Sequence, residues 1–310
     1  MKKNILFLGG ALSLAALIII CIAWLPAAPH ATALPEKKKI VFIAGGCSHG
    51  PGEHEHYAGC ALLAEQLNKQ TGNLVDAVVY KGWPADTAVL NDAASIVLYM
   101  DGGVGHAALP HLDHLDKLMK KGTGLACLHY AVEAPRDTGG AEFKDWIGGY
   151  FEINWSVNPH WDAAYNRLPK HPVTNGVKPF TIKDEWYYHM RFRDDMSGVT
   201  PILSAVPPAS SLGKEYGTHS NNEWVSREVA AGRPQVMCWT AERTDGGRGF
   251  GFTGGHRHTN WGNENFRKVV LNGIVWTAKV AVPSNGVATP PLSNAELQKN
   301  LDQKPCSRFR

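Results

Sequence analysis

The sequence lacks an excess of charge of one sign. Its 310 residues include 31 Lys and Arg against 28 Asp and Glu, a formal net charge of +3, and two of the positive residues, Lys2 and Lys3, belong to a separate N-terminal segment. A balance so close to neutral gives no electrostatic basis for binding nucleic acid or an anionic membrane surface. We therefore expect neither of them as a partner of the folded chain.

Two familiar patterns are also missing. The nearest approach to a dinucleotide-binding fingerprint is Gly102-x-x-Gly105, which lacks the G-x-G-x-x-G spacing that opens a helix. No internal repeat of fixed period occurs, which argues against a solenoid. Hydrophobic residues make up 44% of the chain and charged residues 19%. These are the values of an ordinary globular protein, long enough to bury a core without disulfide bonds.

The N-terminus has the pattern of a targeting segment. Lys2 and Lys3 precede an apolar run over residues 5–25, and Ala31-Thr32-Ala33 fits the A-x-A cleavage rule. We expect residues 1–33 to be a signal peptide that directs the protein to the periplasm or the extracellular space. The apolar run is also about long enough to span a bilayer. Retention as an inner-membrane anchor is therefore the alternative, and the only membrane association we expect.

Few cysteines remain once this segment is removed, and their number is odd. An odd count in an oxidising compartment leaves at least one thiol free or paired between chains. No C-x-x-C motif occurs. Two of the cysteines lie inside apolar runs and are expected to be small buried hydrophobic residues. The five are Cys47, Cys60, Cys127, Cys238 and Cys306, and the two in apolar runs are Cys127 and Cys238.

Apolar runs closed by glycine or polar residues alternate with helical periodicity between residues 39 and 279. Continuous apolar runs predict strands that are buried on both faces, as in a parallel sheet. Their alternation with helices predicts right-handed βαβ units and a doubly wound, mostly parallel α/β sheet of the flavodoxin-like type. Strands are expected at residues 40–44, 75–80, 96–100, 124–128, 200–206, 235–240 and 249–253, and helices at 57–69, 110–121 and 266–278.

Between about residues 143 and 193 this alternation weakens, and tryptophan becomes frequent. We interpret the stretch as an aromatic-rich insertion of short strands and loops rather than a second independent core. Residues 280–310 are rich in Pro and Asn and are expected to form a polar C-terminal tail.

Histidine follows most of the predicted strands. In an open parallel sheet, ligands bind outside the carboxyl ends of the strands. Histidines at several strand ends facing one crevice are how a metal site or an acid/base cluster would be assembled. His49 follows the first strand, His106 the third and His129 the fourth, while His256 and His258 follow the last.

Several motifs, in order, resemble the ThuA-like (trehalose-utilisation) proteins, whose fold is similar to that of the class I glutamine amidotransferase-like superfamily. They are IVFIAGG-x-SHG-PGEHEH, DGG-x-GH, GLACLHYAVE, DEWYYHMRF and GGH-x-H-x-NW, and they extend over about residues 39–279. The resemblance implies a small-molecule substrate, a sugar or an oxidised (keto) sugar derivative. It also implies that the domain occupies this range.

The superfamily comparison bears on the nucleophile. Amidotransferases of this fold carry a cysteine on a tight strand-to-helix elbow, paired with a histidine after a late strand. Here His129 falls at the elbow, Cys127 falls inside the preceding strand, and His256 matches the partner histidine. Two histidines cannot form a Cys–His pair. We therefore do not expect a cysteine-dependent glutamine amidotransferase.

Histidines from three loops are the candidate ligands of a divalent metal, zinc being the first choice. His49, His129 and His256 would supply three neutral imidazoles and leave one position open, as catalytic zinc sites do. Glu185 lies among aromatic residues, and we expect these to raise its pKa and make it a general base. His129, His256 and Glu185 are thus the candidate catalytic residues for hydrolysis or isomerisation.

The remaining candidates would contact the sugar. Aromatic rings suit stacking on sugar faces, although packing in the core is the commoner use of tryptophan. Two alternatives remain open, a metal-independent hydrolase and a non-catalytic carbohydrate-binding protein. The candidate substrate-binding residues are Trp83, His106, Tyr130, Trp186, His258 and Trp261.

Overall fold

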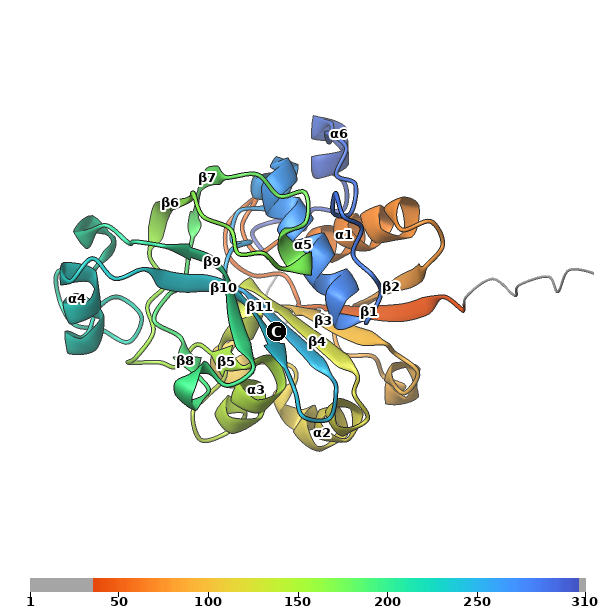
Figure 1. Ribbon diagram of the computed structural model, residues 1–310, viewed down its shortest axis with the longest axis horizontal. Helices are drawn as coiled ribbons and strands as arrows, with labels where there is room; N and C mark the ends of the chain where they lie inside the picture. Colours follow the sequence, from red (N-terminus) through yellow and green to blue (C-terminus); the bar gives the residue numbers. More distant parts are fainter. Residues whose placement is uncertain (1–35, 307–310) are drawn as a thin grey trace, which may run out of the picture. The chain divides into compact units, whose positions relative to one another are not determined.

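The computed structural model describes residues 36–306, and one central sheet of seven strands organises them (Figure 1). The strand order is β2-β1-β3-β4-β11-β10-β9. The first five strands in this order pair in parallel, whereas β10 is antiparallel to both of its neighbours. This arrangement confirms the predicted mostly parallel α/β sheet. The strands are β1 (Lys38–Ala44), β2 (Val75–Lys81), β3 (Ser95–Tyr99), β4 (Gly124–Leu128), β9 (Val199–Ala205), β10 (Gln235–Glu242) and β11 (Arg248–Phe252).

Helices cover both faces of the sheet, as Figure 1 shows. On one face α1 (His56–Gln70) and α5 (Glu264–Thr277) pack on a core that includes buried residues of both helices. On the other face α2 (Leu112–Lys120) and α3 (Gly140–Ile147) pack on a second core. The sheet is thus doubly wound, as the alternation of strand and helix patterns predicts.

Strand β1 shows why its sequence is apolar throughout. Successive side chains of a strand point to opposite faces of the sheet. Ile40 and Phe42 enter the core beneath α1 and α5, whereas Val41 and Ile43 enter the core beneath α2 and α3. Because both faces are covered by helices, neither set of positions tolerates a polar residue.

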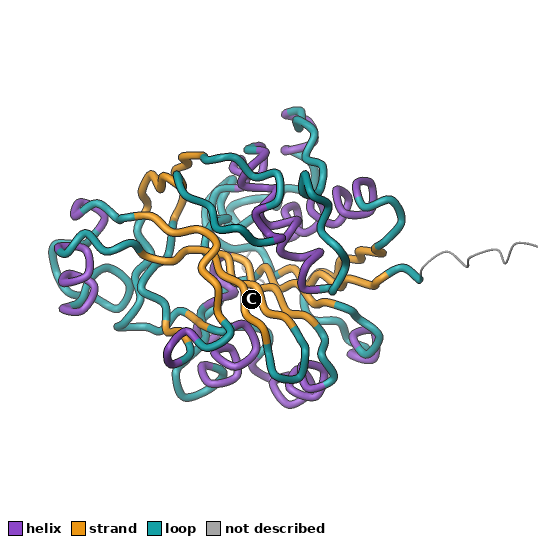
Figure 2. The backbone as a smooth tube through the Cα atoms, in the orientation of Figure 1, coloured by secondary structure: helices purple, strands orange, loops and turns teal. Residues whose placement is uncertain are grey.

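The predicted aromatic-rich insertion is present between β4 and β9. It contains two small antiparallel sheets, visible among the short strands in Figure 2. One pairs β5 (Gly149–Tyr150) with β8 (Arg191–Phe192), and the other pairs β6 (His160–Tyr165) with β7 (Phe180–Glu185). A further helix, α4 (Glu223–Ala230), lies between β9 and β10 in the sequence. The insertion brings β7 and its terminal Glu185 back over the carboxyl edge of the main sheet.

The expected polar tail is packed against the domain along its described part. We call residues 280–306 the C-terminal strap; it includes the short helix α6 (Asn294–Leu297). Lys304 Nζ lies 3.3 Å from Glu55 Oε1, and both side chains are only 1% exposed. A disulfide joins Cys306 to Cys47, the third residue after β1. The other three cysteines among the described residues are buried and unpaired, in keeping with the odd count.

Within residues 36–306, no helix combines the length and the apolarity needed to cross a bilayer. The segment 1–33, predicted to be a signal peptide or an anchor, lies outside the described residues.

Loss of the disulfide is expected to destabilise the protein. Cys47 and Cys306 are 259 residues apart in sequence, and closing so long a loop restricts the unfolded chain. Cys306→Ser should lower the free energy of unfolding by about 2–5 kcal/mol, measured by denaturant titration without reductant. As a control, dithiothreitol should destabilise the wild type and leave Cys306→Ser unchanged. Equal stability of both proteins under oxidising conditions would contradict this prediction.

Candidate metal centre

Three loops at the carboxyl edge of the sheet bring histidines together. His129 follows β4 and His256 follows β11, and these two strands are parallel neighbours, so their ends meet. His54 comes from the loop that joins β1 to α1. His129 has a φ of 54°, in the left-handed region that a non-glycine residue rarely adopts, at the elbow position predicted for it. All three imidazoles are buried.

Three ring nitrogens and one carboxylate oxygen converge. His54 Nε2 lies 3.0 Å from His129 Nε2 and 3.0 Å from His256 Nδ1. Glu185 Oε2 lies 2.9 Å from His256 Nδ1 and 3.4 Å from His129 Nε2. All four atoms lie within 4.8 Å of one another. A zinc ion with bonds of about 2.0–2.1 Å would separate tetrahedral ligands by about 3.3 Å.

The second nitrogen of each ring faces an acceptor. His54 Nδ1 lies 2.8 Å from Asp101 Oδ1, and His129 Nδ1 lies 2.8 Å from the carbonyl oxygen of Thr253. His256 Nε2 lies 3.4 Å from Glu53 Oε1. Carboxylates and carbonyls only accept, so each outer nitrogen has a partner for an N–H group. With the protons on the outer nitrogens, the three rings would direct lone pairs at one point, which is the arrangement of metal-ligating histidines with their outer partners. The inner nitrogen of His256 also faces the Glu185 carboxylate; burial opposes protonation of this ring, but the contact with Glu185 prevails and raises its pKa.

Burial controls the charge of these groups. It lowers the pKa of His54 to about 2, although the hydrogen bond to Asp101 opposes this, so the ring is neutral. Burial also opposes ionisation of Glu185, but its contacts with His129 and His256 prevail and hold the pKa of this carboxyl below its ordinary value. The expected rise in the pKa of Glu185 is therefore wrong, because His129 and His256 contact its carboxylate and favour the ionised form more than burial opposes it.

Hydrogen bonds between the first and last loops hold His54 and His256 in register. The His54 N–H donates to the carbonyl of His256 over 3.0 Å, and an isolated antiparallel bridge pairs Glu53 with Arg257. The buried Asp184 carboxylate fixes the same last loop, because it accepts from the N–H groups of Gly255 at 2.7 Å and Arg257 at 3.3 Å. Neighbouring residues of β7 thus orient the His256 loop and face its ring.

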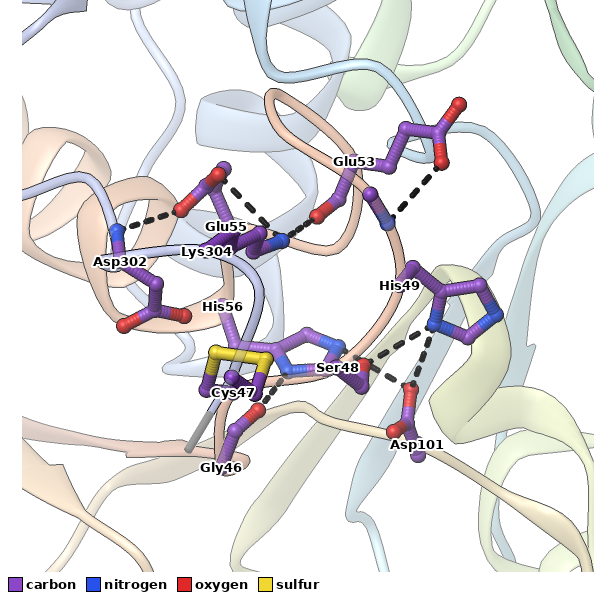
Figure 3. Close-up of a disulfide and its surroundings, with 12 residues drawn as sticks. Gly46, Cys47, Ser48, His49, Glu53, Glu55, His56, Asp101, Asp302 and Lys304 are labelled. Atoms are coloured by element: carbon purple, nitrogen blue, oxygen red, sulfur yellow. Dashed lines mark hydrogen bonds and ion pairs between the residues drawn. A yellow bond between two sulfur atoms is a disulfide. The ribbon is translucent and has the colours of Figure 1, made fainter. Parts of the chain in front are cut away.

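A second group of ligand-type atoms adjoins the first around Asp101. His49, His54 and Asp101 offer atoms within 4.8 Å of one another. Figure 3 shows His49 and His56 turned toward the Asp101 carboxylate, beside the disulfide and the Lys304–Glu55 pair. His56 is buried, with its Nε2 3.6 Å from Asp101 Oδ1. Asp101 therefore lies against three histidines, His49, His54 and His56.

The structure selects a different member of the first loop than the sequence suggests. His54, and not His49, has a ring nitrogen in the group formed with His129, Glu185 and His256. The His49 side chain is 40% exposed and stacks on His54 with the ring centroids 3.5 Å apart. The metal role of His129 and His256 stays a prediction, and His54 replaces His49 as their partner.

Most of the predicted sugar-stacking residues are used elsewhere. Trp186 and Trp261 are fully buried in the core against Phe266, and Trp83 stacks on His111, the residue just before α2. None of these three rings forms an open stacking surface beside the histidine cluster, because each ring packs against other side chains.

Of the other three predicted substrate-binding residues, two are buried away from the cluster and one lies beside it. His106 is buried, and both ring nitrogens bond the backbone, Nε2 to Ala131 O and Nδ1 to Ala108 N, each over 3.1 Å. His258 is buried near Glu55 and Lys304, under the strap. Tyr130 does lie at the cluster, with its ring centroid 5.9 Å from that of His54. Burial and nearby carboxylates raise the pKa of Tyr130 to about 12.

Four residues at the centre were not identified from the sequence as site residues. Tyr187 Oη lies 3.2 Å from His129 Nε2 and 3.3 Å from Glu185 Oε2, and His160 Nε2 lies 3.9 Å from Glu185 Oε1. The other two are His54 and Asp184. For His54, Asp184 and Tyr187 the signal was the clustering of charged residues in GEHEH and DEWYYH, which indicates a site but not which residue faces it. His160 lies outside both motifs, and no sequence pattern marked it.

Comparisons with known proteins agree with this architecture. A sequence model of the ThuA family, described as trehalose utilisation, matches residues 46–277. The crystal structure of a ThuA-like protein from Bacteroides uniformis has a TM-score of 0.54 and 17% sequence identity, and the match covers 81% of this chain and 94% of that one. At this identity the likeness concerns the fold alone. A search of curated proteins gave no match.

The buried His106 should make stability depend on pH. Burial lowers its pKa from 6.5 to about 4, so the unfolded chain binds a proton that the folded chain refuses between these values. Stability should fall as pH drops from 6.5 to 4, by about 3 kcal/mol from this residue. Denaturant titrations in EDTA should give His106→Gln a shallower decline than the wild type. Identical slopes would contradict the assignment.

Proposed function

The chain belongs to the ThuA trehalose-utilisation family, and we propose that it is an exported, metal-dependent hydrolase of a sugar or an oxidised (keto) sugar derivative. The family supplies the class of substrate. The side chains at the carboxyl edge of the sheet supply the argument for the chemistry.

One observation carries the proposal. Nitrogens of three buried imidazoles converge, with His54 Nε2 3.0 Å from each of the other two ligand nitrogens. Facing nitrogens at this distance need a proton or a metal ion between them, because two bare lone pairs repel one another. The set has the three imidazoles, the outer acceptors and the adjacent carboxylate of a catalytic zinc site. We infer that His54, His129 and His256 hold a divalent cation.

The remaining side chains can bind the substrate and move protons. A bound divalent cation would lower the pKa of a water molecule and polarise a sugar oxygen. Glu185, ionised and within 3.4 Å of two of the ligand nitrogens, would accept the proton of the attacking water. Asn158 donates to the other oxygen of Glu185 over 3.1 Å and so orients the carboxylate. Tyr187 would hold the sugar oxygen through its hydroxyl.

Export is part of the proposal. Lys2, Lys3, the apolar run and Ala31-Thr32-Ala33 support secretion, with cleavage after Ala33. The Cys47–Cys306 disulfide supports an oxidising compartment, because such bonds are rare in the cytosol. An intact mass that begins at Leu34, in protein recovered from the envelope fraction, would separate a cleaved signal from an anchor.

Metal content tests the central claim. Protein comprising residues 34–310 should contain about one zinc or similar divalent ion per chain, measured by elemental mass spectrometry. His54→Ala and His129→Ala should lose most of it with an unchanged circular dichroism spectrum. His49→Ala is the matched control from the same loop and should keep the ion. If His54→Ala kept the metal ion and His49→Ala lost it, His49 and not His54 would be the ligand from this loop.

Activity assays separate the alternatives. Trehalose, other glucosides and their keto derivatives should be hydrolysed, and a chelator should abolish turnover that added zinc restores. Cys127→Ser is the control for the amidotransferase route and should keep full activity, since Cys127 is buried within β4. Turnover that survives metal removal would favour the metal-independent hydrolase. Sugar binding without turnover would favour a carbohydrate-binding protein.

A further inference from the structure

A second pair of ionisable side chains lies beside the metal centre, outside the ligand set. His219 Nε2 lies 3.3 Å from each oxygen of the Glu133 carboxylate. The Glu133 side chain is only 2% exposed, whereas the His219 side chain is 31% exposed. Among the described residues His219 is the one side-chain partner of this buried carboxylate. A buried acid beneath an accessible imidazole is the arrangement of oriented catalytic histidines.

Glu133 is held close to the metal centre by the turn after β3. The peptide N–H of Gly103 donates to the Glu133 carbonyl over 3.1 Å. At Gly102 a Cβ atom would lie 2.2 Å from the carbonyl oxygen of Tyr130, so only glycine permits this approach. The same turn begins at Asp101, which bonds His54. Asp101 and Glu133 are thus neighbours across one tight contact.

His219 is positioned from the other side by the insertion. Its carbonyl accepts from the Asn158 N–H over 3.0 Å, and its ring stacks on Phe151 with the centroids 5.3 Å apart. Phe151 in turn contacts Tyr187, whose hydroxyl reaches Glu185. Asn158 therefore links the two groups directly, because its side chain bonds Glu185 while its backbone holds His219.

From this geometry we propose that His219, oriented by Glu133, is the general acid that protonates the leaving oxygen of the sugar substrate. The inference rests on the proposed hydrolysis and assigns its second proton transfer. Nε2 donates to Glu133, so the mobile proton is on Nδ1, whose neighbour is the hydroxyl of the exposed Thr218 at 3.0 Å.

The atoms of the step balance. The water oxygen bonds to the sugar carbon, and its proton goes to Glu185. The carbon–oxygen bond to the leaving group breaks, and the electron pair stays on that oxygen, which takes the Nδ1 proton of His219. Glu185 then releases a proton to solvent and His219 regains one, so the net reaction consumes one water.

The electrostatics suit a proton donor at neutral pH. The hydrogen bond to Glu133 raises the pKa of His219 above its ordinary value, with burial opposing and the charge of Glu185 assisting. The carboxylates that act on His219 are Glu133, which bonds its Nε2, and Glu185, whose charge reaches it; the Thr218 hydroxyl lies beside its Nδ1. A raised pKa keeps the imidazolium populated where Glu185 is ionised.

The test uses the metal-loaded protein, two variants and two leaving groups. Methyl and nitrophenyl glucosides, in unoxidised and keto form, share a sugar and differ in how much the leaving oxygen needs a proton. His219→Gln should reduce turnover of the methyl compound by 10²–10⁴-fold, the usual range for general acid catalysis, and that of the nitrophenyl compound by less than about tenfold. Glu133→Gln should give a smaller loss. His114→Gln on α2 is the remote control.

An independent readout follows the imidazole itself. Titration followed by nuclear magnetic resonance should give His219 a pKa above 6.5 in the wild type and a lower pKa in Glu133→Gln. A merely structural contact between the two residues would not require this difference. Metal content should equal that of the wild type in both variants. The alkaline limb of the turnover profile reports loss of the proton from His219, and it should shift to lower pH in Glu133→Gln.

The outcomes separate this inference from the proposed function. Equal losses on both leaving groups, or wild-type turnover of the methyl compound by His219→Gln, overturn the acid role and leave the metal-dependent hydrolase intact. A metal-loaded wild type that cleaves none of these glucosides overturns both. An unshifted His219 in the titration overturns the role assigned to Glu133.

Discussion

The convergence of three buried imidazoles on one point imposes the main constraint on this molecule. The facing ring nitrogens lie 3.0 Å apart, a distance that requires a proton or a metal ion between them. Each ring keeps its orientation only because an acceptor holds its outer nitrogen. These acceptors come from separate loops: Asp101 after β3, the Thr253 carbonyl after β11 and Glu53 in the first loop. The close loop contacts, the bridge to Arg257 and the buried Asp184 all follow from the need to fix these directions.

Much of the fold could be predicted because its signals are local. A run such as residues 40–44 is apolar at every position when both faces of a strand are covered, and residues 266–278 repeat with the period of a helix. The edge of the sheet that carries the site follows from parallel topology alone. This is why the sequence places His129 and His256, which follow β4 and β11, at the same edge; their ring centroids lie 5.5 Å apart.

The remainder depends on contacts that the sequence does not encode locally. The loop after β1 is long enough for several of its histidines to reach the edge of the sheet. The backbone turns of the loop place His54 in the group with His129 and His256 and leave the His49 side chain partly exposed. The pairing of Cys47 with Cys306 joins residues that no pattern relates. A tryptophan that stacks on a ligand and one that fills a core look alike in the sequence, so the buried positions of Trp186 and Trp261 could not be predicted. The direction of the pKa shift of Glu185 depends on which groups contact its carboxylate, and the sequence does not specify these contacts.

The C-terminal strap makes the order of synthesis matter. Ribosomes build a chain from its N-terminus, so every strand of the central sheet, the last of which ends at Phe252, is made before Lys304 and Cys306. Until these two residues emerge, Glu55 lacks its buried cationic partner and Cys47 has no sulfur to join. A chain cut short before residue 304 would therefore keep the whole sheet and still leave the loop that carries His54 untied.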